Sequence, residues 1–223
     1  MLQETVGIAD IKYASTFSNF GRRGTRTAFA DFVKVHIPPT DLSFLCDNFQ
    51  IDHYGVFVRP FPGMLQTVND LGYTVYAQFP STVVAQRLKS KYPEASIDVT
   101  IWKLQRNTEK LELFIVDGLG PSKALNSEFL VEAQAINHVA FSPNVLQKSL
   151  VHRFKSIMQG SGLQQSSAGI NPKECYVHDG ENVQGTGVTL VYFTKSAPGN
   201  YARDVCSNVE VCMVGTYSLS HKL

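Results

Sequence analysis

The fold of this chain is decided by Ile136-Asn137-His138-Val139-Ala140-Phe141-Ser142, a short β-prone run with a histidine at its third position. An earlier stretch, Ile51-Asp52-His53-Tyr54-Gly55-Val56-Phe57, nearly repeats it. The chain contains a second repeat. Leu111-Glu112-Leu113-Phe114-Ile115-Val116 aligns without a gap on Val209-Glu210-Val211-Cys212-Met213-Val214. Self-similarity at long spacing indicates a repeated structural unit. The sequence therefore predicts two copies of one module.

The composition is that of an ordinary folded protein. The chain has 223 residues, of which 43% are hydrophobic and 17% are charged. Such a composition rules against disorder and provides enough apolar side chains for a sizeable core. At this length, one large domain and two small, tightly joined modules are both reasonable.

Charge and hydropathy exclude several kinds of partner. The 20 lysines and arginines nearly balance the 19 acidic residues, so neither nucleic acid nor a membrane surface is an expected partner. No apolar run approaches the roughly 20 residues that a bilayer-spanning helix needs. The N-terminus, Met1-Leu2-Gln3-Glu4, lacks the basic patch and apolar segment of a secretory signal. We therefore expect a cytoplasmic protein, monomeric or homodimeric, with its cysteines reduced.

Periodic patterns predict the elements of the first module, which covers residues 51–121. The expected elements are a strand at 51–58, a helix from Met64 that ends at Gly72, a strand at 73–79, a helix from Ser81 to about residue 91, and strands at 97–104 and 111–116. The helix from Ser81 is extra to a βαβββ order. We interpret it as an insertion or a lid.

The second module, residues 136–223, is expected to repeat this order. Its expected elements are a strand from Ile136, a helix across 144–159, and strands at 175–177, 187–194 and 209–214. Residues 122–135 are expected to be a linker between the modules, and residues 1–50 an N-terminal extension. Within the extension, residues 31–37 alternate like a strand.

The unpaired strand edges of the two modules determine the expected fold class. Neither module closes its own sheet, so pairing the two modules is the economical arrangement. The expected fold is therefore α+β, with paired βαβββ modules that form one cupped mixed sheet around a metal site. The N-terminal extension precedes it.

The duplicated positions carry four metal-capable side chains, in the order His53, Glu112, His138 and Glu210. Each shares its strand face with small or apolar residues, and a carboxylate is costly to bury unless it is paired or binds a cation. Two imidazoles and two carboxylates suit Zn²⁺, Ni²⁺, Fe²⁺, Mn²⁺ or Co²⁺. One such residue alone would more simply be a core histidine or a surface glutamate. Their duplicated order favours metal ligands.

Other polar residues are weaker candidates. His152 and His178 have no counterpart in the other module, and His36 falls on the polar face of its expected strand, so we expect all three to be surface residues. Tyr192 and Thr189 lie on opposite faces of one expected strand. One of them should face the cup, where its hydroxyl would hydrogen-bond a substrate oxygen.

With the four candidate ligands in place, the chain resembles the vicinal oxygen chelate superfamily over about residues 51–216. The resemblance rests on Ile51-Asp52-His53, Ile136-Asn137-His138 and the strands that contain Glu112 and Glu210. The superfamily includes glyoxalase I, methylmalonyl-CoA epimerase, extradiol dioxygenases and 4-hydroxyphenylpyruvate dioxygenase. The resemblance implies a divalent metal in the cup, which binds a small-molecule substrate through neighbouring oxygens.

The resemblance leaves two chemistries open. A His, Glu, His, Glu set is similar to that of glyoxalase I, and it implies lyase or isomerase chemistry with Glu112 or Glu210 as both ligand and base. The dioxygenases use two histidines and one glutamate, which His53, His138 and Glu210 would match.

Aromatic residues favour oxygen chemistry. Leu190-Val191-Tyr192-Phe193-Thr194-Lys195 resembles the corresponding region of 4-hydroxyphenylpyruvate dioxygenase. We expect Tyr192, Phe193 and Phe114 to contact an aromatic or 2-oxo acid substrate. The favoured hypothesis is a non-haem Fe(II) dioxygenase, and the glyoxalase-like or epimerase-like enzyme is the alternative. A metal-free binding protein on the same fold, as in the antibiotic-resistance members, is a third hypothesis.

Overall fold

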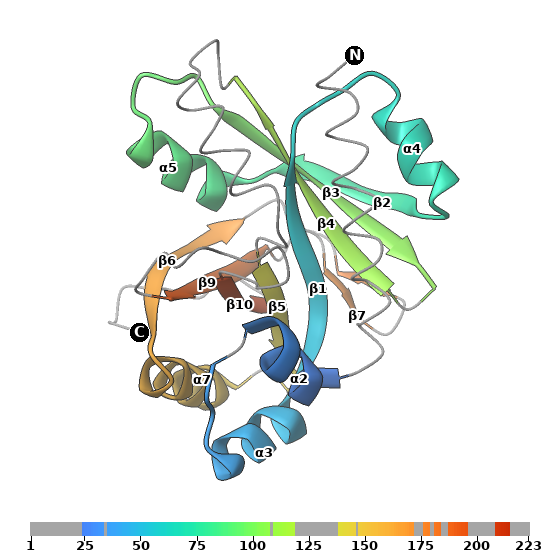
Figure 1. Ribbon diagram of the computed structural model, residues 1–223. Coiled ribbons are helices and arrows are strands. Elements are labelled where there is room, and N and C mark those ends of the chain that lie inside the picture. Colours follow the sequence, from blue (N-terminus) through green and yellow to red (C-terminus); the bar gives the residue numbers. More distant parts are fainter. Residues whose placement is uncertain are drawn as a thin grey trace. The chain divides into compact units, whose positions relative to one another are not determined.

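The computed structural model describes residues 24–33, 35–107, 109–118, 138–145, 147–171, 176–178, 181–183, 187–195 and 208–214 (Figure 1). These residues belong to two compact units. Unit 1 contains the described residues from 53 to 118, and unit 2 contains those from 24 to 52 and from 138 to 214. Strand β1 (Phe49–Val58) passes from unit 2 to unit 1 between Asp52 and His53.

Unit 1 has the expected βαβββ order with one inserted helix. After β1 come α4 (Met64–Asp70), β2 (Thr74–Pro80), α5 (Thr82–Lys91), β3 (Asp98–Arg106) and β4 (Glu109–Asp117). The strand order is β2-β3-β4-β1, in which β1 and β4 are parallel and the other neighbours are antiparallel. The strands expected from the alternating pattern are confirmed.

Local sequence signals determine where α4 ends and where α5 begins. α4 ends beside Gly72, whose φ of 80° is the left-handed conformation that glycine adopts most readily. α5 begins after Ser81, whose Oγ accepts a hydrogen bond from the Val84 backbone N–H at 3.3 Å. Val84 and Leu88 of α5 are buried in a cluster that includes Phe114 of β4. The expected extra helix is confirmed, and it packs on the sheet of its own unit.

Gly118, which follows β4, is required by its backbone conformation and by its surroundings. Its φ is +76°, and a Cβ at this position would collide with the Ser96 carbonyl oxygen. Gly63 has a similar φ of +78°, but a Cβ there would meet nothing within 4 Å.

We expect Gly118→Ala to lower the unfolding free energy by more than about 2 kcal/mol, and Gly63→Ala by about 1 kcal/mol. The difference arises because both alanines are strained by positive φ but only the first also collides with backbone. Urea denaturation of the two variants measures it. Equal losses of stability would contradict the collision at Ser96.

Unit 2 repeats the module of unit 1. Its elements after the gap in the description are β5 (His138–Pro143), α7 (Lys148–Gly160), β6 (Leu163–Asn171), β7 (Tyr176–His178), β8 (Glu181–Val183), β9 (Val188–Lys195) and β10 (Asn208–Val214). The strand order is β1-β5-β10-β9-β6, with β5 parallel to β10 and β9 antiparallel to both β10 and β6. The α+β class, the mixed strand pairing and the βαβββ duplication are therefore confirmed.

One expected strand of unit 2 is present, but it is not the second strand of the module. The second strand of the module is β6, Leu163–Asn171, which pairs with β9. Its sequence, LQQSSAGIN, is polar, and most of its side chains are exposed or half-buried, so no apolar alternation marks it. β7, at the expected place, pairs with β8 in a separate two-stranded sheet.

The expected strand at residues 31–37 was wrong. A short π-helix, η2 (Ala28–Val33), covers its first part, and residues 35–38 are neither helix nor strand. The neighbouring elements are α2 (Gly24–Thr27) and α3 (Pro39–Asn48). Alternation over so few residues is a weak signal for a strand.

The described part of the N-terminal segment, residues 24–48, belongs to the core of unit 2. The ring of Phe29 stacks on Phe141 of β5 with centroids 4.7 Å apart, and Phe49 lies 4.9 Å from Phe154 of α7. The Thr25 hydroxyl donates a hydrogen bond to the Phe49 carbonyl oxygen at 2.9 Å. The expected extension thus contributes buried aromatic rings to the second module.

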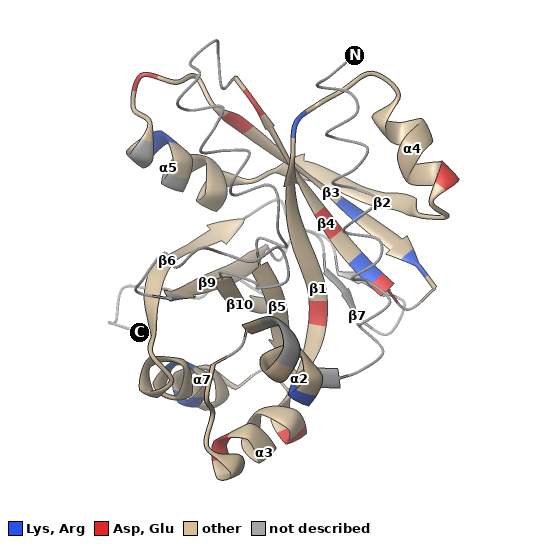
Figure 2. Ribbon diagram, in the orientation of Figure 1, with Lys and Arg blue, Asp and Glu red and all other residues tan. Residues whose placement is uncertain are grey.

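Acidic and basic residues are scattered over the elements of both units (Figure 2), in keeping with a net charge of +1. Among the described residues, no helix combines the length and the apolar character that a membrane-spanning helix needs. The expected linker at residues 122–135 lies outside the described residues.

Candidate metal centre

The two predicted His–Glu pairs occupy equivalent positions in the two modules. In unit 1, the residue of β1 that is opposite Glu112 lies two positions after His53. In unit 2, the residue of β5 that is opposite Glu210 lies two positions after His138. Residues two apart on a strand share a face of the sheet. Each module therefore presents its histidine and its glutamate on one face of a parallel strand pair.

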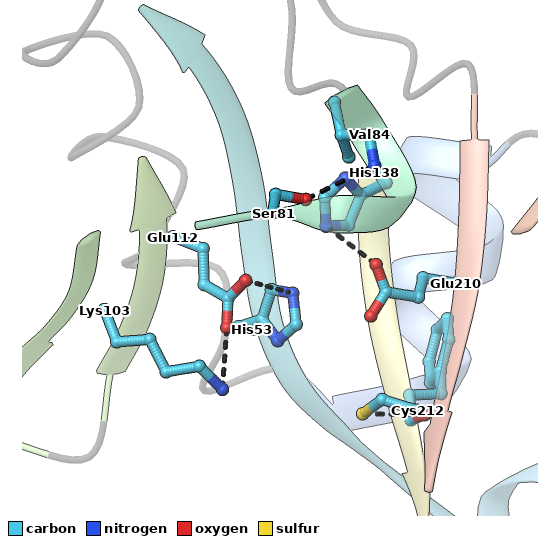
Figure 3. Close-up of polar contacts among 9 residues, drawn as sticks. His53, Ser81, Val84, Lys103, Glu112, His138, Glu210 and Cys212 are labelled. Atoms are coloured by element: carbon cyan, nitrogen blue, oxygen red, sulfur yellow. Dashed lines mark hydrogen bonds and ion pairs between the residues drawn. The ribbon is translucent and has the colours of Figure 1, made fainter. Parts of the chain in front are cut away.

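In unit 1, Glu112 lies between a histidine and a lysine (Figure 3). His53 Nε2 is 3.3 Å from Glu112 Oε2, and Lys103 Nζ is 3.0 Å from Glu112 Oε1. None of the three side chains is more than 5% exposed. Lys103 Nζ also lies 5.6 Å from the ring centroid of Phe79. The two oxygens of Glu112 thus have different partners.

In unit 2, Glu210 lies beside His138 (Figure 3). His138 Nε2 is 3.2 Å from Glu210 Oε2, and both side chains are buried. The ring of Tyr192 on β9 meets the His138 ring in an edge-on contact, with centroids 5.5 Å apart. Cys212, on the same face of β10 as Glu210, donates a weak hydrogen bond to the Phe141 carbonyl oxygen at 3.5 Å.

Lys103 is a residue of this site that the sequence patterns did not single out. It is opposite Glu112 on the β3–β4 ladder, just as Tyr192 is opposite Glu210 on the β9–β10 ladder. Lys103 and Tyr192 are therefore equivalent positions of the duplicated module. The available signal was a lysine inside the apolar run Ile101-Trp102-Lys103-Leu104, because lysines are seldom buried without a partner.

Phe114 adjoins the His53–Glu112 pair along the same sheet face. It lies two positions after Glu112 on β4, and its ring packs edge-on against Phe57 with centroids 5.6 Å apart. The apolar cluster of these rings includes Val84 of α5. The inserted helix therefore covers the part of this face that lies beyond the polar residues.

Phe193 lies on the opposite face of its strand from Tyr192. Its ring is 5.9 Å from that of Phe154 on α7, whereas Tyr192 contacts His138. Thr189 is buried on the same face of β9 as Phe193. Of the residues of β9 that were considered for substrate contact, Tyr192 is the one beside a candidate ligand, and Phe193 belongs to the core under the helix.

The other histidines whose side chains are described, His36 and His152, lie outside these clusters. His36 and His152 are exposed, as expected for residues without a duplicated counterpart. The side chain of His178 lies outside the described part of the chain.

The spacing within each half suits two neighbouring ligands of one metal ion. Metal–ligand bonds of about 2.0–2.2 Å place adjacent ligand atoms roughly 3 Å apart in tetrahedral or octahedral coordination. The Nε2–Oε2 separations of 3.3 Å and 3.2 Å are close to this value. Imidazole and carboxylate are donors that Zn²⁺ and Fe²⁺ accept. The residues of both halves therefore fit a divalent metal.

No family model and no curated protein matches the chain. Solved structures that it resembles include hypothetical protein BH1468 from Bacillus halodurans C-125, with 18% identity, 76% of this chain and 97% of that chain covered, and a TM-score of 0.40. A mutant of 4-hydroxymandelate synthase from Streptomyces coelicolor is 11% identical. The likeness covers 76% of this chain and 50% of that chain, with a TM-score of 0.44. Methylmalonyl-CoA epimerase from Mycobacterium tuberculosis is 12% identical. The likeness covers 76% of this chain and 90% of that chain, with a TM-score of 0.37.

Proposed function

We propose that the protein is a metal-dependent enzyme of the vicinal oxygen chelate type, in which His53, His138 and Glu210 hold one divalent cation. The proposal rests on the duplicated register, because a buried His–Glu pair recurs at the same position of both modules. The three proposed ligands are buried side chains of the kinds that can hold a metal ion. A buried carboxylate is costly without a cation, and a bound metal removes that cost.

The proposed reaction is an Fe(II)-dependent oxidation by O₂. Glu112 already has a cation, because Lys103 Nζ is 3.0 Å from its Oε1. The set that remains is two histidines and one carboxylate, which is typical of non-haem Fe(II) oxygenases. We therefore favour a dioxygenase that acts on a small 2-oxo acid or aromatic substrate, bound through adjacent oxygens.

Charge supports an anionic substrate. A bound Fe²⁺ would supply Lewis acidity at the substrate oxygens and a position for O₂. The charges of Glu210, Glu112 and Lys103, added to those of a divalent cation, leave one positive charge in excess. A monoanion that offers two adjacent oxygens, such as a 2-oxo acid, neutralises this charge.

The chain's own residues orient the substrate and exclude water. Tyr192 lies beside His138 and is the proposed hydrogen-bond donor to a substrate oxygen. Phe114 and Phe57, which pack beneath α5, supply the apolar surface next to the first His–Glu pair. An apolar surround strengthens the electrostatic interactions of the site because it keeps water away.

A glyoxalase-like lyase or isomerase is the second candidate. The observation that favours it is the 3.3 Å separation of Glu112 Oε2 from His53 Nε2, which nearly equals that of the Glu210–His138 pair. In this case Glu112 is a fourth ligand, and one of the two glutamates accepts the proton from the substrate.

Metal analysis and O₂ uptake test these two candidates on the purified protein. For the dioxygenase we expect stoichiometric iron and O₂ consumption when 2-oxo acids or aromatic substrates are added to the Fe²⁺-loaded protein under reducing conditions. Stoichiometric Zn²⁺ or Ni²⁺ with turnover that is independent of O₂ would support the glyoxalase-like enzyme instead. A protein that binds no metal would contradict both and leave the metal-free binding protein.

We place this activity in the cytoplasm, where Fe²⁺ and thiols stay reduced. Cys46 and Cys212, the cysteines among the described residues, form no disulfide. Free thiols suit a reducing compartment.

A further inference from the structure

We infer that Lys103 decides which of the two duplicated glutamates binds the metal, by holding Glu112 and so leaving Glu210 as the carboxylate ligand. The inference rests on the proposed function and deepens it. By backbone register, Glu112 and Glu210 are equivalent, and so are their histidines. The difference between the halves lies in the residue opposite each glutamate.

That residue is a cation in one half and neutral in the other. Lys103 is opposite Glu112, and Tyr192 is opposite Glu210. The tyrosine side chain is a neutral phenol, whereas the lysine side chain is an ammonium cation. The duplication thus supplies two equal carboxylates but only one ammonium group at this position.

Burial makes the contact between Lys103 and Glu112 strong. Both side chains are 5% exposed, and Nζ lies 3.0 Å from Oε1. A buried ammonium group is costly to leave without a counter-charge, and salt screens a buried pair much less than an exposed one. The Phe79 ring, 5.6 Å from Nζ, adds an apolar wall with a weak attraction for the cation. Lys103 therefore keeps Glu112 oriented toward itself.

A divalent cation on Glu112 would have to approach this ammonium group. One oxygen of Glu112 already forms an ion pair with Lys103, and positive charges near the two oxygens of one carboxylate repel each other. The Glu210 carboxylate has an uncharged tyrosine at the equivalent position. A metal that can choose between the two halves is therefore bound by Glu210, and Lys103 is a positioning residue that acts through Glu112.

The test is a double-mutant cycle at Lys103 and Glu112. For each variant, the Zn²⁺ affinity of the metal-depleted protein is measured by competition with a coloured chelator. In the wild-type background we expect Glu112→Gln to change the affinity by less than about threefold, whereas Glu210→Gln weakens it by about 100-fold or more. In the Lys103→Met background, which removes the charge at similar length, Glu112→Gln should weaken binding by about 10- to 100-fold.

The cycle separates this role from simpler ones. Loss of the positive charge of Lys103 raises the affinity for any cation. This gain is the same in Lys103→Met and in Lys103→Met/Glu112→Gln, so it cancels when the two variants are compared. If Lys103 had a purely structural role, its replacement by methionine would not make Zn²⁺ affinity depend on Glu112. Lys103→Arg keeps the charge, and in this background Glu112→Gln should again have little effect.

The outcomes are distinguishable. If Glu112→Gln weakens Zn²⁺ binding of the otherwise wild-type protein as much as Glu210→Gln does, the role of Lys103 is overturned while a metalloenzyme stands. This single comparison decides the matter even if Lys103→Met does not fold. A wild-type protein that binds no Zn²⁺ would overturn the proposed metal site together with this inference.

Discussion

Replacing His138 by alanine is expected to abolish metal binding, with a loss of affinity greater than the roughly 10- to 100-fold effects of residues that only support a ligand. Both candidate reactions require this imidazole. Its Nε2 lies 3.2 Å from Glu210 Oε2, so the substitution removes one imidazole from the ligand set beside this carboxylate. Metal content after loading with Fe²⁺ or Zn²⁺, and chelator competition, measure the effect.

His152→Ala is the matched control, because this histidine belongs to the same unit but is exposed on α7. We expect wild-type metal content from it. A far-ultraviolet circular dichroism spectrum like that of the wild type shows that the His138 variant is folded, and His138→Asn provides a polar replacement if alanine is not tolerated. A folded His138 variant that retains wild-type affinity would remove this residue from the site.

Phe154→Ala is expected to lower the unfolding free energy by about 3–5 kcal/mol, which is the usual cost of removing a large aromatic side chain from a core. Phe154 on α7 is fully buried and joins several elements of unit 2. Its ring contacts those of Phe49, Phe141 and Phe193, at centroid distances of 4.9, 5.9 and 5.9 Å. Denaturant unfolding monitored by circular dichroism measures the loss.

Val145→Ala is the control for this substitution, since Val145 is in the same unit and is 52% exposed. We expect its unfolding free energy to stay within about 0.5 kcal/mol of the wild type. If Phe154→Ala were equally harmless, the packing of α7 and the N-terminal segment around this ring would be in doubt.

The strands that the sequence predicted are those where burial produces an apolar, β-prone run. Most side chains of β1 and β4 are buried, and both strands were expected, as was β10. β6 was missed because most of its side chains are exposed or only partly buried, so burial imposes no apolar alternation on LQQSSAGIN. The packing of residues 24–48 on unit 2 depends on ring contacts between residues about a hundred positions apart, which local periodicity does not record.

The candidate site shows the same limit. The histidines and glutamates were found because the duplication presents each of them twice, in Ile51-Asp52-His53 and Ile136-Asn137-His138 and in the two glutamate strands. Lys103 was missed because the second module has Tyr192 at the equivalent position, so no repetition draws attention to it. A residue that distinguishes the two copies is invisible to a search for what they share.

The early position of residues 24–52 in the chain has a consequence for synthesis on the ribosome. Phe29 and Phe49 leave the ribosome well before their partners Phe141 and Phe154, which are translated about a hundred residues later. At about 5–20 residues per second, these apolar rings wait for several seconds or longer while the whole of unit 1 is made. The nascent chain therefore exposes these apolar rings during that interval, and chaperones that bind hydrophobic segments have time to engage them.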